Sequence, residues 1–217
     1  MKAFEVRGDA AVAELDDEER MVVARIVADV GLLLGGEAFG MEERSIPDRL
    51  DPGEDVERYL RGLEESLAEP GDPAVLRLLP NAAPTDREVA DEFRRLTESE
   101  LRDLKIARLR TMWEQLSEDG PEWEVSVEDA LPTASALTDV RLVLASRLSL
   151  DTDDDAERLH TEIELAAHAM SSDDGHEWDI DPERVWLGML YQALTWLQDS
   201  LVTAMVDAEA AQGEPHE

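Results

Sequence analysis

The segment DPERVWLGMLYQALTWLQDSLVTAM, residues 181–205, predicts a long helix that belongs in the core of a helical protein. Asp181 is a good N-cap, and Pro182 then takes the first helical position, where its missing N–H costs nothing. We expect the helix to run from Pro182 to about Ala208. Large apolar side chains recur along it at helical spacing, and we expect them to be buried. They are Trp186, Leu190, Leu194, Leu197 and Leu201, with Trp196 nearby.

A second apolar helix is predicted near the N-terminus. Asp16 and Glu19 are spaced as a capping box. The stretch Met21–Leu34 that follows is apolar on most sides, and Gly35-Gly36 ends it. A helix this apolar usually lies centrally or in an oligomer interface. We therefore place the first and last helices in the core, and a homo-oligomer is possible.

Two short stretches predict strands. Residues 3–15 alternate weakly around Gly8-Asp9, which indicates a β-hairpin. Residues 122–127 place Trp123, Val125 and Val127 on one face, which indicates a strand that could pair with the hairpin.

Further helices are expected between these elements, at 56–67, 74–79, 85–95, 97–116, 129–150 and 156–170. Thr85–Glu88 and Thr97–Glu100 are both capping boxes, so residues 85–116 are expected to form two helices. Pro132 is tolerable only in the first turn of its helix, where it removes no hydrogen bond.

The expected fold class is therefore mainly α. It is a helical bundle with a small antiparallel β element formed by the N-terminal hairpin and a strand near 122–127. A length of 217 residues suits one domain, expected at residues 1–211. Acidic loops are expected at 36–54, 151–155 and 171–180, with a frayed tail at 212–217.

The composition restricts the partners. The chain has 53 acidic and 20 basic residues, a formal net charge of -33. Nucleic-acid binding draws most of its affinity from Lys and Arg. We therefore expect no direct contact with nucleic acid or anionic membranes, and we expect basic partner surfaces. With no cysteine in the sequence, thiolate chemistry is excluded. No apolar run reaches membrane-spanning length, and the first residues do not form a secretory signal, so we expect a cytoplasmic protein.

Two patterns could bind a metal ion. Asp151, Asp153, Asp155 and Glu162 occupy positions one, three, five and twelve of a calcium loop. The sixth position is Ala156, where the sharp turn needs glycine, so a solvated helix start is favoured.

His160, Glu164 and His168 share one helix face and could hold a metal ion. No further ligand is clear, although His176 is close in sequence, so an exposed polar stripe is favoured. We find no phosphate loop, nucleophile elbow or dinucleotide fingerprint, and we therefore expect no cofactor and no catalytic residue.

One segment carries a basic cluster. Residues 94–110 hold six Lys or Arg residues with four acidic residues interleaved at 92–103, so the segment is close to neutral. Such charges usually pair along and between helices. As contacts for a protein partner, besides the acidic loops, we select four residues: Arg102, Lys105, Arg108 and Glu114.

The stretch DPAVLRLLPNAAPTDREVADEFRRLTESELRDLKIARLRTM, beginning at Asp72, resembles an actinobacterial domain-of-unknown-function family typically encoded beside the ClpS adaptor. ALTDVRLVLASRL at Ala136–Leu148 is similar to the family's Asn-Asp-Leu-Arg-Leu segment, with Thr138 in place of Asn. YQALTWLQDSLV at Tyr191–Val202 is similar to its Trp-Leu-Gln-Glu-Ser-Leu segment.

The resemblance implies a functional class. Some members are identified as AosR-type oxidative-stress transcriptional regulators, in which a cysteine pair senses oxidation and the protein joins a sigma factor. This chain has no cysteine, so that mechanism cannot operate here unchanged. We expect a non-enzymatic regulatory or interaction protein that acts through protein partners. The alternative is an enzyme or a metal-binding protein whose carboxylate site is not recognisable from sequence.

Overall fold

The computed structural model describes residues 1–36, 39, 71–81, 83, 85–171 and 181–213. The helix expected at 56–67 lies outside these residues. So do residues 214–217 and most of the loops expected at 36–54 and 171–180.

The predicted β element is confirmed as a three-stranded antiparallel sheet in the order β1-β2-β3. Strand β1 spans Glu5–Arg7, β2 spans Ala10–Glu14 and β3 spans Glu122–Ser126. Gly8, with a φ of 68°, lies in the turn between β1 and β2, where a left-handed conformation favours glycine. The sheet thus joins the N-terminus to the segment that follows residue 116.

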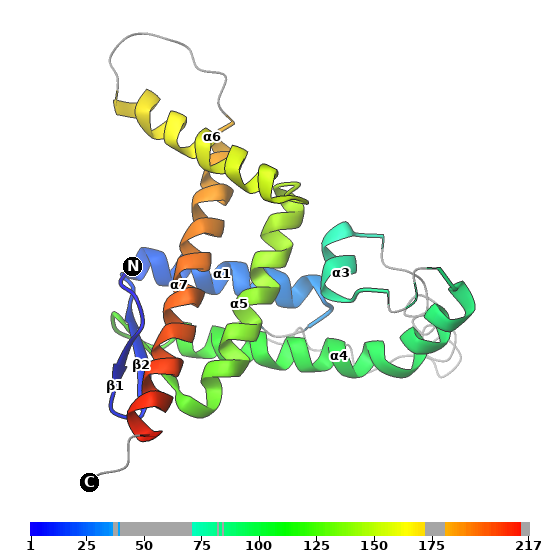
Figure 1. Ribbon diagram of the computed structural model, residues 1–217, viewed down its shortest axis with the longest axis horizontal. Helices are drawn as coiled ribbons and strands as arrows, with labels where there is room; N and C mark the ends of the chain where they lie inside the picture. The colour runs from blue at the N-terminus through cyan, green and yellow to red at the C-terminus, as the bar shows by residue number, and fades with distance from the viewer. Residues whose placement is uncertain (37–38, 40–70, 82, 84, 172–180, 214–217) are drawn as a thin grey trace, which may run out of the picture.

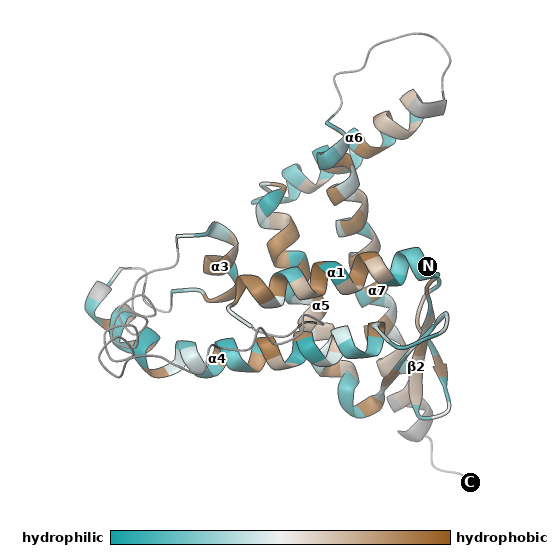
Figure 2. Ribbon diagram, turned by 180° about the vertical axis from the view of Figure 1, so that it is seen from behind, coloured by the Kyte–Doolittle hydropathy of each residue, from teal (hydrophilic) through white to brown (hydrophobic). Residues whose placement is uncertain are grey.

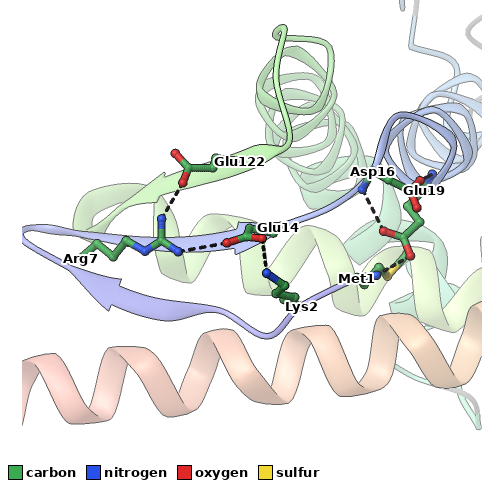
Figure 3. Close-up of polar contacts among 7 residues, drawn as sticks. All are labelled: Met1, Lys2, Arg7, Glu14, Asp16, Glu19 and Glu122. Atoms are coloured by element: carbon green, nitrogen blue, oxygen red, sulfur yellow. Dashed lines mark hydrogen bonds and ion pairs between the residues drawn. The ribbon is translucent and has the colours of Figure 1, made fainter.

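Charged side chains cross the strands on one face of this sheet (Figure 3). The Arg7 guanidinium donates to Glu122 on β3 at 2.6 Å and to Glu14 on β2 at 3.4 Å, so one side chain links three strands. Lys2 also pairs with Glu14. The hydrogen bond from Lys2 is the main reason that the pKa of Glu14 is lowered.

Helix α1, Asp17–Leu33, begins where the sequence predicts it. The Glu19 N–H donates to Asp16 at 2.9 Å and the Asp16 N–H donates to Glu19 at 2.9 Å, which completes the capping box. The helix buries Val23, Val27 and Val30 in the main core.

The long helices form two crossed pairs (Figure 1). Helix α1 lies beside α4, Arg87–Leu116. Helix α5, Val127–Arg147, lies beside α7, Pro182–Gly213, and this pair crosses the first. The short helix α3, Pro73–Leu78, packs on α5, and α6, Asp153–Ser171, packs across the N-terminal part of α7. Apolar segments of α1, α5 and α7 gather where the helices cross (Figure 2).

Most of the described residues are helical, so the predicted fold class is confirmed. None of the described helices is long and apolar enough to cross a membrane.

The prediction of two helices over residues 85–116 is wrong, because α4 is continuous. Its N-cap is Asp86, whose side chain accepts from the Val89 N–H at 3.2 Å. The Thr97 hydroxyl donates to the Phe93 carbonyl at 2.9 Å, one turn back in the same helix. The Thr97 hydroxyl therefore forms its hydrogen bond inside the helix, and Thr97 does not cap a helix N-terminus.

The prediction that Pro132 lies in the first turn of its helix is also wrong. Helix α5 begins at Val127, because the Ser126 hydroxyl caps it by accepting from the Asp129 N–H at 3.1 Å. Pro132 therefore lies in the second turn, inside the helix, where it cannot donate to the Glu128 carbonyl.

The core prediction for α7 is partly confirmed. Leu190, Leu194, Leu197 and Leu201 are at most 7% exposed. Trp186 and Trp196, however, are 44% and 46% exposed.

Trp186 lies at the edge of the leucine face, where the neighbouring helices cover only part of a large ring, and Trp196 lies on another side of the helix. The tryptophan that fills the core is Trp123 of β3, which is fully buried and packs edge-on against Phe4 with ring centroids 5.1 Å apart.

Candidate functional site

Helix α4 contributes to the main core with its C-terminal half, and one face of its N-terminal half is exposed. Leu109, Met112 and Leu116 are at most 3% exposed and belong to the main core. The N-terminal half extends past α1 and α5 (Figure 1). This half of the helix therefore offers a surface that the bundle does not cover.

Five large apolar side chains lie exposed on that half. Val89, Phe93 and Leu96 follow one another at helical spacing on one face, and Leu104 continues it two turns later. Leu101 lies at the border of the same face. We call these residues the α4 stripe, and their exposed fractions run from 38% to 60%: Val89 54%, Phe93 49%, Leu96 60%, Leu101 38% and Leu104 46%.

Carboxylates lie within and beside the α4 stripe. Glu100 is exposed on the stripe's own face between Leu96 and Leu104, and Glu92 and Asp103 are exposed on one flank of it. Glu92 also accepts two hydrogen bonds from Arg95, at 2.7 and 3.1 Å, and the bonds from Arg95 lower its pKa. Apolar side chains with carboxylates among and beside them suit a partner that presents apolar side chains among basic ones.

The opposite face of this half is held by an ion-pair network. The Arg94 side chain is 7% exposed and lies 3.0 Å from Glu98, which also pairs with Arg102 at 2.7 Å. Arg102 donates in addition to the Leu34 carbonyl at 2.9 Å, at the C-terminal end of α1. These contacts fix the orientation of α4, and hence the direction in which the stripe points.

The hollow beside the α4 stripe is small. It lies between Leu79, Ala90, Phe93 and Leu101, and its volume is about 30 Å³. That is room for about one water molecule. As far as the described residues show, the α4 stripe is therefore a surface without a ligand pocket of its own.

The four contacts selected from the sequence lie in different environments. Glu114 is exposed and Arg108 is half-buried. Arg102 is engaged by Glu98, as described above, and Lys105 turns inward to pair with Asp139 of α5.

The Lys105 side chain is largely shielded from solvent, since it is 14% exposed and that of Asp139 is 4% exposed. Burial raises the pKa of Asp139, and the hydrogen bond from Lys105 opposes that shift. Lys105 and Asp139 thus tie α4 to α5, and their role in partner binding stays a prediction.

The residues of the calcium pattern are engaged by other protein groups. Asp151 pairs with Arg77, and Glu162 accepts from Arg184 at 2.7 Å. Asp155 forms a capping box with Thr152 at the start of α6, with bonds of 2.8 and 3.3 Å.

The Thr152 hydroxyl is the main cause that lowers the pKa of Asp155, to about 2. Asp153 lies exposed at the first position of α6. This arrangement matches the start of an ordinary helix.

The histidine pattern lies on an exposed face of α6. His160 Nε2 is 3.4 Å from Glu164, and His160 Nδ1 lies 3.1 Å from the Gln192 amide of α7. His168 is exposed two turns later on α6, and His176 lies outside the described residues. Across residues 1–36, 71–81, 85–171 and 181–213, no group of three or more His, Asp or Glu converges to hold a metal ion.

Our reading of the sequence missed the α4 stripe. One signal was present, because Val89, Phe93 and Leu96 fall on a different helix face from Leu109 and Met112 when all of them are placed on one helix. Splitting the segment into two helices hid this difference, since each short helix could then be oriented separately.

Comparison with known proteins gives one result. A search of the curated proteins finds no match, and a search of the solved structures finds none either. The family model described as "Domain of unknown function (DUF2017)" matches residues 1–205. This match includes all of the sheet and α4 and most of α7, and the chain therefore belongs to the DUF2017 family.

Proposed function

We propose that this protein is a non-enzymatic regulatory protein that acts by binding a protein partner through the α4 stripe. The partner presents a surface with apolar side chains among Lys and Arg. The observation that carries the proposal is the exposure of five large apolar side chains along one helix face.

Exposed apolar patches on a folded domain mark interaction sites more often than single exposed residues do. The α4 stripe includes an aromatic residue, Phe93, and aromatic residues are enriched at the buried centre of interfaces. An extended stripe on a helix suits a partner helix that lays its own apolar face along it.

Charge supports a basic partner. The carboxylates within and beside the α4 stripe are part of a formal net charge of -33 for the chain. This charge attracts a basic protein at long range and speeds association at low salt. The same charge disfavours direct binding to DNA, so a regulatory role would have to proceed through a protein.

The resemblance to AosR-type regulators supports a transcription component, such as a sigma factor, as the partner, in the cytoplasm of an actinobacterium. In this chain recognition would rest on shape and charge, because there is no thiol to form or break a bond. Oxidants would therefore leave binding unchanged, apart from slow methionine oxidation.

The experiment is capture of partners from the native host with the wild-type chain and with Phe93→Glu. The charged side chain should abolish a contact that buries Phe93. Met21→Glu is the matched control, since Met21 is also exposed, at 67%, but lies on α1. Each capture is repeated with peroxide and at raised salt.

We expect partners that bind the wild type and Met21→Glu, are lost with Phe93→Glu, weaken at raised salt and ignore peroxide. Capture that depends on peroxide and ignores salt would contradict the proposal, and would place the sensing thiol on the partner. Equal loss in both variants would show that the α4 stripe is not the contact.

A further inference from the structure

A second feature lies at the other end of the molecule, away from the exposed half of α4. A hollow of about 440 Å³ opens between the sheet, the start of α5 and the C-terminal part of α7. Small-molecule sites in proteins typically measure about 300–1,000 Å³ and are mostly apolar with a few polar groups. The hollow falls within this range, unlike the one-water hollow beside the α4 stripe.

The floor of the hollow is one row across the sheet. Val6 of β1 lies opposite Ala11 of β2, and Ala11 lies opposite Val125 of β3. The walls come from the helices, with Ala130 and Leu131 on α5 and Met205 and Ala208 among those on α7.

The hollow exists because the residues that meet there are small. Where the sheet faces the bundle further along, Trp123 and Phe4 fill the space between strands and helices. At the hairpin end, the corresponding positions carry alanines from three elements. They are Ala10, Ala11, Ala130, Ala204 and Ala208.

Among the residues that the structure describes, the two charged ones that line the hollow are both acidic. Asp9 comes from the hairpin turn, and Glu128 comes from the first turn of α5, and both are exposed. Arg7, the basic residue of the same hairpin, is engaged by Glu14 and Glu122 across the sheet. A ligand whose apolar part lies in the hollow would therefore have its polar end near the negative charge of these two carboxylates.

We propose that this hollow binds a compact apolar ligand that carries a positive charge, such as an aliphatic or aromatic amine. The apolar part lies on the row Val6–Ala11–Val125, and the ammonium group lies between Asp9 and Glu128. A carboxylate or phosphate ligand is disfavoured by the same two side chains. The proposal concerns a separate site, so it stands or falls independently of partner binding by α4.

The test uses short alkyl probes and the full-length chain. Butylammonium, hexylammonium, hexanol and hexanoate are titrated, and amide chemical shifts of the hollow are followed by NMR. Each methylene that enters the hollow should tighten binding about fourfold. Hexylammonium should bind more tightly than hexanol by about threefold, and hexanoate should bind more weakly than hexanol by about the same factor.

Three variants distinguish binding of the probes in the hollow from a general attraction of cations to an acidic protein. Ala208→Phe fills the hollow from α7, where Ala208 is half-buried, and should abolish hexylammonium binding. Glu128→Gln should weaken hexylammonium about threefold and leave hexanol unchanged. Glu124→Gln is the matched control, because Glu124 lies on the opposite face of β3 from Val125 and is exposed, and it should leave both affinities unchanged.

Two results would overturn the proposal. One is equal binding of hexylammonium to Ala208→Phe and the wild type, provided that circular dichroism shows the variant folded. The other is equal weakening by Glu124→Gln and Glu128→Gln, which would show attraction to net charge alone.

Discussion

Replacement of Arg20 by Met tests how the sheet is joined to the helices. Arg20 belongs to α1 and is 4% exposed. Its guanidinium donates to three carbonyls between the end of α4 and the start of β3: Gln115 in the last turn of α4 at 3.0 Å, Glu118 in the connecting loop at 2.8 Å and Glu122, the first residue of β3, at 2.8 Å. Met keeps most of the packing of the stem and removes all three bonds.

The expected loss in the free energy of unfolding follows from those three hydrogen bonds. A hydrogen bond from a charged donor contributes about 1.5–3 kcal/mol, and three of them are lost. Part of that loss is recovered, because the variant no longer buries a charged group. We expect a net loss of about 3 kcal/mol in the free energy of unfolding, and a melting temperature lower by about 6–12 °C for a chain of this size.

The assay is urea unfolding followed by circular dichroism, with Arg25→Met as the control on the same helix, since Arg25 is exposed. The control should change the free energy of unfolding by less than about 0.5 kcal/mol. A value for Arg20→Met as small as that of the control would refute the reasoning.

Three further predictions concern the core, the buried pair and the net charge. Leu194 is fully buried, so Leu194→Ala should lower the free energy of unfolding by about 2–5 kcal/mol in urea, and an unchanged midpoint would show that α7 is peripheral. The pKa of Asp139 is raised above 3.8 by burial, so its carboxyl group stabilises the fold fully below that pH, and this contribution is lost as pH rises through the folded pKa. Asp139→Asn should therefore make stability fall less steeply with pH above 3.8 than in the wild type, and identical slopes would contradict the assignment. Because the chain carries a formal charge of -33, its melting temperature should rise with added NaCl from about 10 mM to about 500 mM, and a constant value would mean that self-repulsion does not limit stability.

The sequence predicted those elements whose signals are local. The capping box of Asp16 and Glu19, the hairpin around Gly8, and the leucines of α7 all appear where expected. These features depend on a few neighbouring residues or on one period, so tertiary contacts did not change them.

The sequence did not predict features that depend on which elements meet. Thr97 carries a capping signal but is enclosed in one continuous helix. The sequence around Lys105 does not show that the fold brings Asp139 opposite it and buries the pair. Trp186 lies at the edge of a helix face that the neighbouring helices only partly cover. The hollow at the hairpin end also needs three elements to come together, so no single segment indicates it.

Photo-crosslinking in the native host tests the role of the α4 stripe most directly. A benzophenone amino acid is placed at Leu96, which is 60% exposed on the stripe, or at Met21, which is 67% exposed on α1. If the protein acts through the α4 stripe, position 96 should give a discrete crosslink to a protein with a basic surface, and position 21 should not. Adding Phe93→Glu should remove that crosslink. Equal crosslinking from both positions, or a crosslink at position 96 that survives Phe93→Glu, would contradict the account.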